Sequence, residues 1–282
     1  MKKCYIVILC LALLFGYFIG ISYLTIDVSE YTLTNHQIND DVHIVMISDV
    51  HDHHCLIKDQ VIEKIKELDP DLILCVGDMI DDHSSSDDDM IDFLSDLCDI
   101  SDVFMSLGNH EYSFYDGHIG DLKRIEDVGV HLLDKEYEDI VIHGNNIRIG
   151  GMYDYAFGMK EGKITKIDMD NSETYQFLTH FCDTSSYTIM MAHRPDSFIY
   201  GEAYQWDIDL VLSGHVHGGQ VVLPYIGGLY APEQGWNPYY DYGLFHLDDM
   251  TMIITRGISS SDEFFPRFNN PAEMTSIKLT KE

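Results

Sequence analysis

Positive charge is scarce in this chain of 282 residues. Lys and Arg together number 17, against 48 Asp and Glu, so the formal net charge is −31 at pH 7. Because such an acidic surface repels phosphate backbones, we expect no nucleic acid binding. Apolar residues make up 45% of the chain and aromatics 12%, which is too much for an intrinsically disordered protein. The composition therefore predicts a globular body with a sizeable core.

Cysteine is sparse as well. Six cysteines in a chain of this length are too few for a disulfide scaffold, and no two of them have a CxxC or other metal-binding spacing. Four of them follow the first long apolar run, and the sequence alone cannot pair them: Cys55, Cys75, Cys98 and Cys182. The sequence therefore predicts neither a disulfide framework nor a cysteine-based metal site.

Residues 4–24 lack charged side chains altogether. This apolar run has the 21 residues that an α-helix needs to cross the hydrocarbon core of a bilayer. A cleavable signal peptide has a shorter apolar region and a small-residue cleavage site, which the residues after this run do not provide. We therefore expect an uncleaved membrane anchor over residues 1–26, with a cleaved leader as the alternative.

The charges around this run predict its orientation. Lys2 and Lys3 precede it, and no Lys or Arg follows until Lys58. The positive-inside rule then leaves the N-terminus in the cytoplasm and the body on the other side of the cell membrane. We expect a short connector or edge strand over 27–42 and one large α/β domain over 43–282.

Short apolar runs alternate with helix-like segments along the body. The runs have the length and the bounding turn residues of buried strands, and they cover 43–48, 72–76, 103–107, 187–192 and 208–213. Apolar residues recur at helical spacing within 57–68, 90–97 and 175–181. Such alternation predicts a largely parallel sheet covered by helices. Two hairpins are expected near 138–151 and 243–257.

Metal-binding side chains follow five of the predicted strands. Ligands of open α/β sheets bind beyond the carboxyl ends of the strands, and here these ends carry Asp49 and His51, Asp78, Asn109 and His110, His193, and His215 and His217. Residues i and i+2 of an extended strand end point to the same side, so each Asp-x-His or His-x-His pair could hold one ion. Imidazole and carboxylate donors suit manganese, iron and zinc. The pattern therefore predicts a metal centre at this edge.

The series DVH, GDMIDD, GNHE, AH and GHVH resembles the calcineurin-like metallophosphoesterases over residues 43–280. The resemblance implies a β-sandwich flanked by α-helices, with a centre of two divalent ions (Mn, Fe or Zn). The segments GHVHGGQ and TRGISSSDEFFPRFNNPAEMTSIKL are similar to one subgroup. That subgroup contains bacterial phosphodiesterases held at the membrane by an N-terminal helix, and it is related to UDP-2,3-diacylglucosamine hydrolases.

The resemblance also implies roles for single residues. It assigns one metal to Asp49, His51 and His217, and the second to Asn109, His193 and His215, with Asp78 bridging the two. His110 resembles the catalytic histidine of the family, and Glu111 or Asp81 could hold its tautomer. Arg194 and Arg267 are candidate contacts to the substrate phosphate, since guanidinium groups fit phosphate oxygens. For Arg256, a structural role and a contact to the substrate phosphate are equally compatible with the sequence.

The function expected from this resemblance is hydrolysis of phosphodiester or pyrophosphate bonds by a metal-activated hydroxide. The substrate would be a phosphate ester, lipid-linked or derived from the cell envelope. Two alternatives stay open: a UDP-2,3-diacylglucosamine pyrophosphate hydrolase of lipid A synthesis, and a metal-containing interaction scaffold without activity. The tyrosine-rich segment 224–243 is expected to be a packed loop, with a rim for a lipid or sugar headgroup as the alternative.

Overall fold

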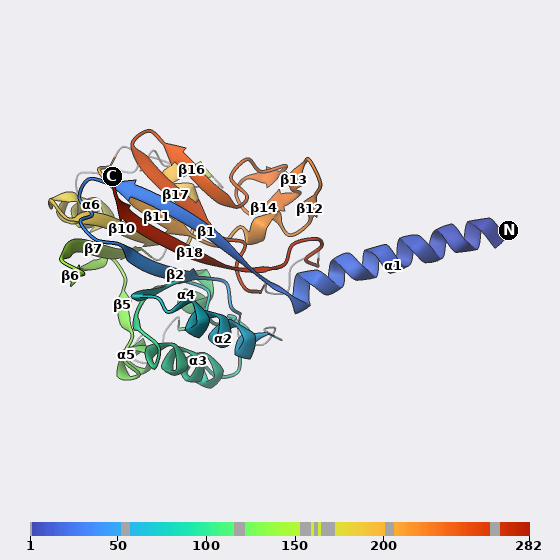
Figure 1. Ribbon diagram of the computed structural model, residues 1–282, viewed down its shortest axis with the longest axis horizontal. Helices are drawn as coiled ribbons and strands as arrows, with labels where there is room; N and C mark the ends of the chain where they lie inside the picture. The colour runs from blue at the N-terminus through green and yellow to red at the C-terminus, as the bar shows by residue number, and fades with distance from the viewer. Residues whose placement is uncertain are drawn as a thin grey trace.

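A computed structural model shows a layered α/β body from which one long helix projects (Figure 1). The structure describes residues 2–51, 57–115, 122–152, 159–160, 163–164, 173–200, 206–259 and 266–282. The long helix α1 spans Lys2–Leu24. Cys55 of the sequence analysis lies outside the described residues.

Two six-stranded sheets face each other in the body. The first has the order β1-β18-β2-β3-β4-β5, from strands Ile26–Asn35, Ala272–Lys281, Val42–Ile47, Leu72–Val76, Asp102–Ser106 and His131–Leu133. The second has the order β16-β17-β11-β10-β7-β6, from Gly243–Leu247, Met250–Ile254, Leu210–Ser213, Tyr187–Ala192, Asn145–Met152 and Glu136–Ile142. Most pairs within the two sheets are parallel, while β18–β2, β16–β17 and β6–β7 are antiparallel.

Successive side chains of each central strand face different layers of the body. In β2, Ile44 and Met46 face the apolar core between the two sheets, whereas Val45 and Ile47 face the helices on the outer side. Side chains of a strand point alternately to opposite faces, so a strand that is apolar throughout needs cover on both. In β10, likewise, Ile189 joins the core between the sheets and Met190 the core on the outer side of the second sheet.

Helices on both outer faces provide this cover. The first sheet is covered by α2, α3 and α5, which span Lys58–Leu68, Asp88–Cys98 and Lys123–Asp127. The second is covered by α6 and α7, which span Glu173–Cys182 and Asp196–Ile199. The short helix α4, Asn109–Phe114, follows β4 directly, and the small pair β8–β9 covers Met159–Lys160 and Lys163–Ile164.

Short hairpins follow β11 and lie between the body and α1 (Figure 1). The 3₁₀ turn η5, His217–Gly219, leads into strands β12 to β15, which span Val222–Leu223, Gly227–Gly228, Tyr230–Ala231 and Gly235–Trp236. We call residues 221–243 the tyrosine lobe. It coincides almost completely with the tyrosine-rich segment of the sequence.

The structure bears out most of the sequence expectations. The β-sandwich with flanking helices is confirmed, and each predicted strand and hairpin is present within a few residues. The expectation of one largely parallel sheet, drawn from strand–helix alternation alone, was wrong. The strands are divided between two sheets, whose inner apolar faces cover each other in one shared core.

Candidate metal centre

The loops after β2, β3, β4, β10 and β11 meet at one end of the sandwich. Three of these strands belong to the first sheet and two to the second, so the centre bridges both. Ligand atoms of Asp49, His51 and His217 lie within 4.8 Å of one another, and so do those of Asp78, His193 and His215. The first group is the first ligand set that the resemblance implied. The second group contains His193 and His215 of the second implied set together with the bridging Asp78. Asn109 carries neither a carboxylate nor an imidazole, so it belongs to neither group.

The two sets lie next to each other. A third group, His51, Asp78 and His110, has its ligand atoms within the same 4.8 Å of one another and joins the first set to the second. Asp78 is thus a member of two groups, as a bridging ligand must be. His193 Nε2 lies 2.9 Å from Asp78 Oδ2 and 3.9 Å from Asp49 Oδ1.

Unpaired buried atoms test whether a metal fits here. Within the described residues, both ring nitrogens of His51, His193 Nε2, His217 Nδ1 and Asp78 Oδ2 are buried without a hydrogen-bond partner. Apart from their ion pair at 2.9 Å, His193 Nε2 and Asp78 Oδ2 have no hydrogen-bond partner among these residues. Buried polar atoms without partners cost free energy. Divalent cations would satisfy these atoms, so the donor set fits a metal centre.

Charge in the centre leads to the same conclusion. Burial raises the pKa of Asp49 to about 6, although His193 lowers it. Burial also lowers the pKa of His51 to about 3, against the carboxylate of Asp78, which raises it. His193 is the exception, since Asp78 and Asp49 outweigh the effect of burial and raise its pKa to about 9. Bound cations would favour the ionised carboxylates and the neutral imidazoles that metal coordination needs.

The backbone reaches these positions through left-handed residues. Five of the proposed ligands have positive φ angles: Asp49 (55°), His51 (45°), Asp78 (53°), His215 (68°) and His217 (46°). The expectation that each i, i+2 pair sits on an extended strand end was therefore wrong, although both pairs do converge. Non-glycine residues in this region store strain, and such strain is concentrated at functional sites.

Two glycines allow the loops to approach each other. A Cβ at Gly214 would lie 2.1 Å from Ser48 Oγ and 2.3 Å from Asp49 Oδ2. A Cβ at Gly108 would lie 2.2 Å from Asp78 Oδ1. Neither clash involves a flexible end that could move away, because both carboxylates are held in the centre. These positions therefore require glycine.

Glu111 holds the loop that carries Asp78. Its buried carboxylate accepts hydrogen bonds from the backbone N–H groups of Asp78 (2.8 Å), Gly108 (2.7 Å), Ile80 (3.2 Å) and Met79. The interpretation of Glu111 as the partner of His110 was therefore wrong, because its oxygens are engaged by four backbone donors. Sequence spacing could not show this, since the donors come from two different loops.

We expect Glu111→Ala to destabilise the protein strongly. The substitution leaves four N–H groups in the interior without their acceptor, at a cost of about 3 kcal/mol or more. For a body of this size, that corresponds to a fall in Tm of roughly 6–12 °C. Thermal unfolding of the metal-free chain measures it, with Glu63→Ala on the exposed face of α2 as the control. An equal Tm in the two variants would contradict this account of the loop.

His110 lies next to His51 of the first ligand set and Asp78 of the second. Its Nδ1 accepts a hydrogen bond of 3.0 Å from the backbone N–H of Asp82, and its Nε2 lies 3.9 Å from Asp78 Oδ2. An acceptor at Nδ1 leaves the proton of a neutral imidazole on Nε2. The proton is thus on the nitrogen that faces the candidate ligands. A backbone donor of this kind leaves no signal in the sequence.

Arg194 and Asn109 lie next to the second ligand set. Arg194 Nε donates to Asn109 Oδ1 at 3.4 Å, and the Arg194 side chain is 18% exposed. Glu233 of the tyrosine lobe lies 3.2 Å from His215 Nε2 and 3.9 Å from Arg194 Nη1. A histidine ligand is commonly oriented by a carboxylate on its other nitrogen. Glu233 was not predicted from the sequence, because it is 18 residues away from His215.

Arg267 is placed differently from Arg194. It is 1% exposed, and its guanidinium donates to the carbonyl oxygens of Arg256, Gly257, Ser259, Asn270 and Pro271. Arg256 pairs with Asp27 at 3.1 Å and Glu273 at 3.3 Å. Both arginines tie the last strand to its surroundings. These contacts argue for a structural role and against a substrate contact by Arg267.

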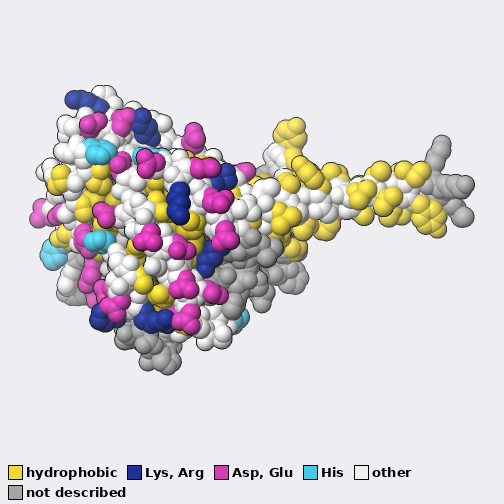
Figure 2. All heavy atoms as spheres, turned by 60° about the horizontal axis from the view of Figure 1, so that its bottom comes forward, with side chains coloured by type: hydrophobic (Ala, Val, Ile, Leu, Met, Phe, Trp, Pro, Cys, Tyr) yellow, Lys and Arg dark blue, Asp and Glu magenta, His cyan; other side chains and the backbone are white. Residues whose placement is uncertain are grey.

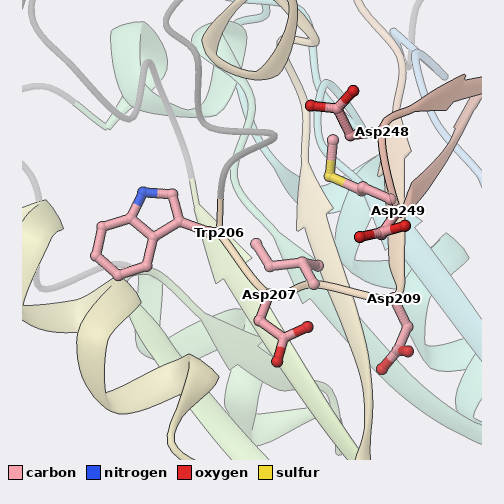
Figure 3. Close-up of a pocket in the computed structure, with 7 residues that line it drawn as sticks. Trp206, Asp207, Asp209, Asp248 and Asp249 are labelled. Atoms are coloured by element: carbon pink, nitrogen blue, oxygen red, sulfur yellow. The ribbon is translucent and has the colours of Figure 1, made fainter.

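A cavity lies at the other end of the second sheet. Figure 3 shows Trp206, Asp207, Asp209, Asp248 and Asp249 around a cavity of about 320 Å³. Asp209 immediately precedes β11, whereas His215 follows it. The cavity and the candidate metal centre therefore lie at opposite ends of this strand.

The chain belongs to the calcineurin-like phosphoesterase family, whose sequence pattern matches residues 42–219, more than half of the chain. This confirms the resemblance seen in the motifs. The match includes every proposed metal ligand and His110. The body is a metallophosphoesterase domain.

Three known proteins illustrate the relationship. An uncharacterized metallophosphoesterase, Cj0846 of Campylobacter jejuni, is 29% identical over 85% of this chain, which spans 59% of that relative's length. Phosphodiesterase YaeI of Escherichia coli is 27% identical over 76% of this chain, and the match covers 72% of YaeI. Among solved structures, phosphopantetheinyl hydrolase of Mycobacterium tuberculosis aligns with a TM-score of 0.47 and 13% identity, over 75% of this chain and 87% of its own.

Proposed function

We propose that the chain is a membrane-anchored, two-metal phosphoesterase that hydrolyses phosphodiester or pyrophosphate bonds. One observation carries the proposal: two sets of buried donors lie next to each other, joined by the group of His51, Asp78 and His110, and several of their atoms have no hydrogen-bond partner in the described part of the chain. The family membership and the relationship to a phosphodiesterase support the same reaction class. In this proposal Asp49, His51 and His217 hold one ion, Asn109, His193 and His215 hold the other, and Asp78 bridges them.

The centre would combine metal chemistry with groups of the chain itself. When bound, two divalent cations supply Lewis acidity toward the phosphoryl oxygens and activate water at neutral pH. His110 holds a proton on Nε2, from which it can donate to a phosphoryl oxygen or to the leaving oxygen. Arg194 lies at the rim of the second ligand set, where its guanidinium can orient the phosphate.

Arg194→Ala is expected to weaken substrate binding. A hydrogen bond to a charged group contributes about 1.5–3 kcal/mol, so KM for a phosphodiester should rise about tenfold or more. The change in kcat should be much smaller, because Arg194 lies outside both ligand sets. Steady-state kinetics separate the two constants, with Lys66→Ala on α2 as the exposed control. An unchanged KM would remove Arg194 from the substrate site.

Helix α1 supports a location at the membrane. Its segment Cys4–Leu24 is 21 residues long, contains an 18-residue window with a mean hydropathy of 2.6, and is long and apolar enough to cross a membrane. We propose that it anchors the chain with the N-terminus in the cytoplasm and the catalytic domain outside, as the lysines before it indicate. We retain the division into anchor (1–26), edge strand (27–42) and catalytic domain (43–282). An anchored site favours a lipid-linked or envelope-derived phosphate ester.

Metal reconstitution tests the proposed function. The full chain in detergent is stripped of metal, then supplied separately with manganese, zinc, iron(II) or magnesium, and assayed on an aryl phosphodiester and an aryl phosphomonoester. We expect metal-dependent turnover, with the diester preferred. Two bound ions without turnover of either ester would contradict the proposed hydrolysis of simple esters and favour the interaction scaffold. The substrate UDP-2,3-diacylglucosamine can be assayed in the same series.

A further inference from the structure

The tyrosine lobe exposes a set of large apolar and aromatic side chains. Tyr225 is fully exposed, and Ile226, Trp236 and Tyr239 are 59%, 63% and 77% exposed. Tyr230 joins them and packs against Trp236 with ring centroids 5.6 Å apart. Figure 2 shows hydrophobic side chains gathered where the body meets α1, while acidic side chains are spread over the rest of that face. Large contiguous apolar surfaces mark interaction sites.

The lobe carries little charge that would oppose burial in an apolar environment. It contains no Lys or Arg, and its only carboxylates are Glu233 and Asp241. Both have polar partners: Glu233, with a side chain 18% exposed, contacts His215, and Asp241 accepts a hydrogen bond of 2.7 Å from the backbone N–H of Gly228. Its large exposed side chains are amphipathic aromatics and one isoleucine, and its other exposed residues are Pro224, Glu233 and Asn237. Tyrosine and tryptophan of this kind are typical of the boundary between a membrane and water.

Residues 267–270 join the lobe to the last turns of α1. The Phe268 ring lies 5.2 Å from the rings of Phe15 and Phe18, and Asn270 N donates to Ser22 Oγ at 3.0 Å. On the other side, Val222 N donates to Phe268 O at 3.0 Å, and Phe268 N donates to Gln220 O at 3.1 Å. The base of the lobe therefore lies level with the last third of the helix, not beyond its end.

The length of the helix then places the lobe in the membrane. Residues 4–17 form the longest continuous run of exposed residues in the described part of α1, although Phe15 already contacts Phe268, and this run is about 21 Å long at 1.5 Å per residue. A hydrocarbon core is about 30 Å thick, so the freely exposed stretch is about 9 Å too short to cross it alone. If residues 18–24 lie in the outer part of the membrane as well, the neighbouring Phe268 and the lobe must enter it with them.

We infer that the tyrosine lobe, residues 221–243, inserts into the outer interface of the lipid bilayer beside α1. This inference rests on the proposed anchoring by α1. Contact through uncharged aromatic side chains needs no anionic lipid, which suits a body of strongly negative charge. Because the lobe follows His217 directly and carries Glu233 to His215, its insertion brings the candidate metal centre close to the lipid headgroups. The substrate class that this position favours is a phosphate ester in the headgroup of a lipid.

The two tryptophans of the chain provide the test. Trp236 lies in the lobe, whereas Trp206 packs against Tyr175 of α6, on the side of the body away from α1 (Figure 1). The full chain is placed in phosphatidylcholine nanodiscs whose acyl chains are brominated near the headgroup, and fluorescence quenching is measured. Trp206→Phe leaves Trp236 as the reporter, and Trp236→Phe leaves Trp206 as the matched control.

We expect Trp236 to lose about half of its emission or more, because it sits at the depth of the bromines, and Trp206 to lose almost none. An unquenched Trp236 in chains that co-purify with the discs would overturn the inference and favour a protein partner for the lobe. Chains that do not enter the discs would overturn the anchor and the inference together. Hydrolysis of a soluble aryl phosphodiester by the same discs reports separately on the proposed reaction.

Discussion

Asp78→Asn is expected to lower kcat/KM for an aryl phosphodiester by a factor of about 10³ or more, since a two-metal centre contributes several kcal/mol to the transition state. Asp78 belongs to the second ligand set and to the group that joins it to the first. His193, His51 and His110 hold the pKa of Asp78 well below the usual range against the effect of burial. The amide of asparagine is neutral and bridges two cations poorly. One ion should therefore be lost as well.

The fold should survive this substitution. Asp78 Oδ1 accepts a hydrogen bond of 2.8 Å from the backbone N–H of His110, and an asparagine oxygen can accept the same bond. Far-UV circular dichroism and Tm of the metal-free variant check this. Asp59→Asn, at an exposed position on α2, is the control for removal of one carboxylate. Near-normal activity of Asp78→Asn with two ions bound would contradict the bridging role.

His110→Ala is expected to lower kcat by about 10²–10⁴, the range for loss of a group that transfers a proton in the transition state. Metal content should change little, because His110 belongs to neither of the two proposed ligand sets. Its ring takes part in one short backbone hydrogen bond and lies at the rim, with 14% of the side chain exposed. The control is His83→Ala, whose side chain is 80% exposed on the neighbouring loop.

Two comparisons separate the possible roles of His110. If Nε2 protonates the leaving oxygen, the loss should be much greater for an alkyl ester than for a nitrophenyl ester, whose leaving group needs no proton. If Nε2 only stabilises the phosphoryl oxygens, both esters should lose equally and His110→Gln should restore part of the activity. Equal kcat for His110→Ala and the unchanged protein would remove His110 from catalysis.

The fold was predictable from the sequence where a strand is buried on both faces. Strands β2, β3, β4, β10 and β11 are continuous apolar runs, and their limits are predicted to within about two residues. Strand β1 was expected only as a connector or edge strand, because its residues alternate between partly buried and exposed. Strand β18 was not predicted: it pairs with β1 and β2, and nothing in its local pattern indicates a partner more than 200 residues away.

The candidate site divides in a similar way. Its proposed ligands could be found from the sequence because each one directly follows a strand, and strand ends of one sandwich meet. The geometry of these ligands could not be predicted from the sequence. It depends on left-handed backbone at Asp49 and Asp78 and on glycines that face other loops. Glu233 and the N–H of Asp82 also escaped prediction, because their effects come from tertiary contact rather than from residue type and spacing.

The central claim is that Asp78 joins two metal ions in one centre, and metal stoichiometry tests it most directly. The full chain and Asp78→Asn are purified in parallel, saturated with manganese or zinc, freed of loosely bound metal and measured by mass spectrometry of the bound ions. We predict two ions per unchanged chain and at most one per variant chain. A single ion in the unchanged chain, or two ions retained by the variant, would contradict the account.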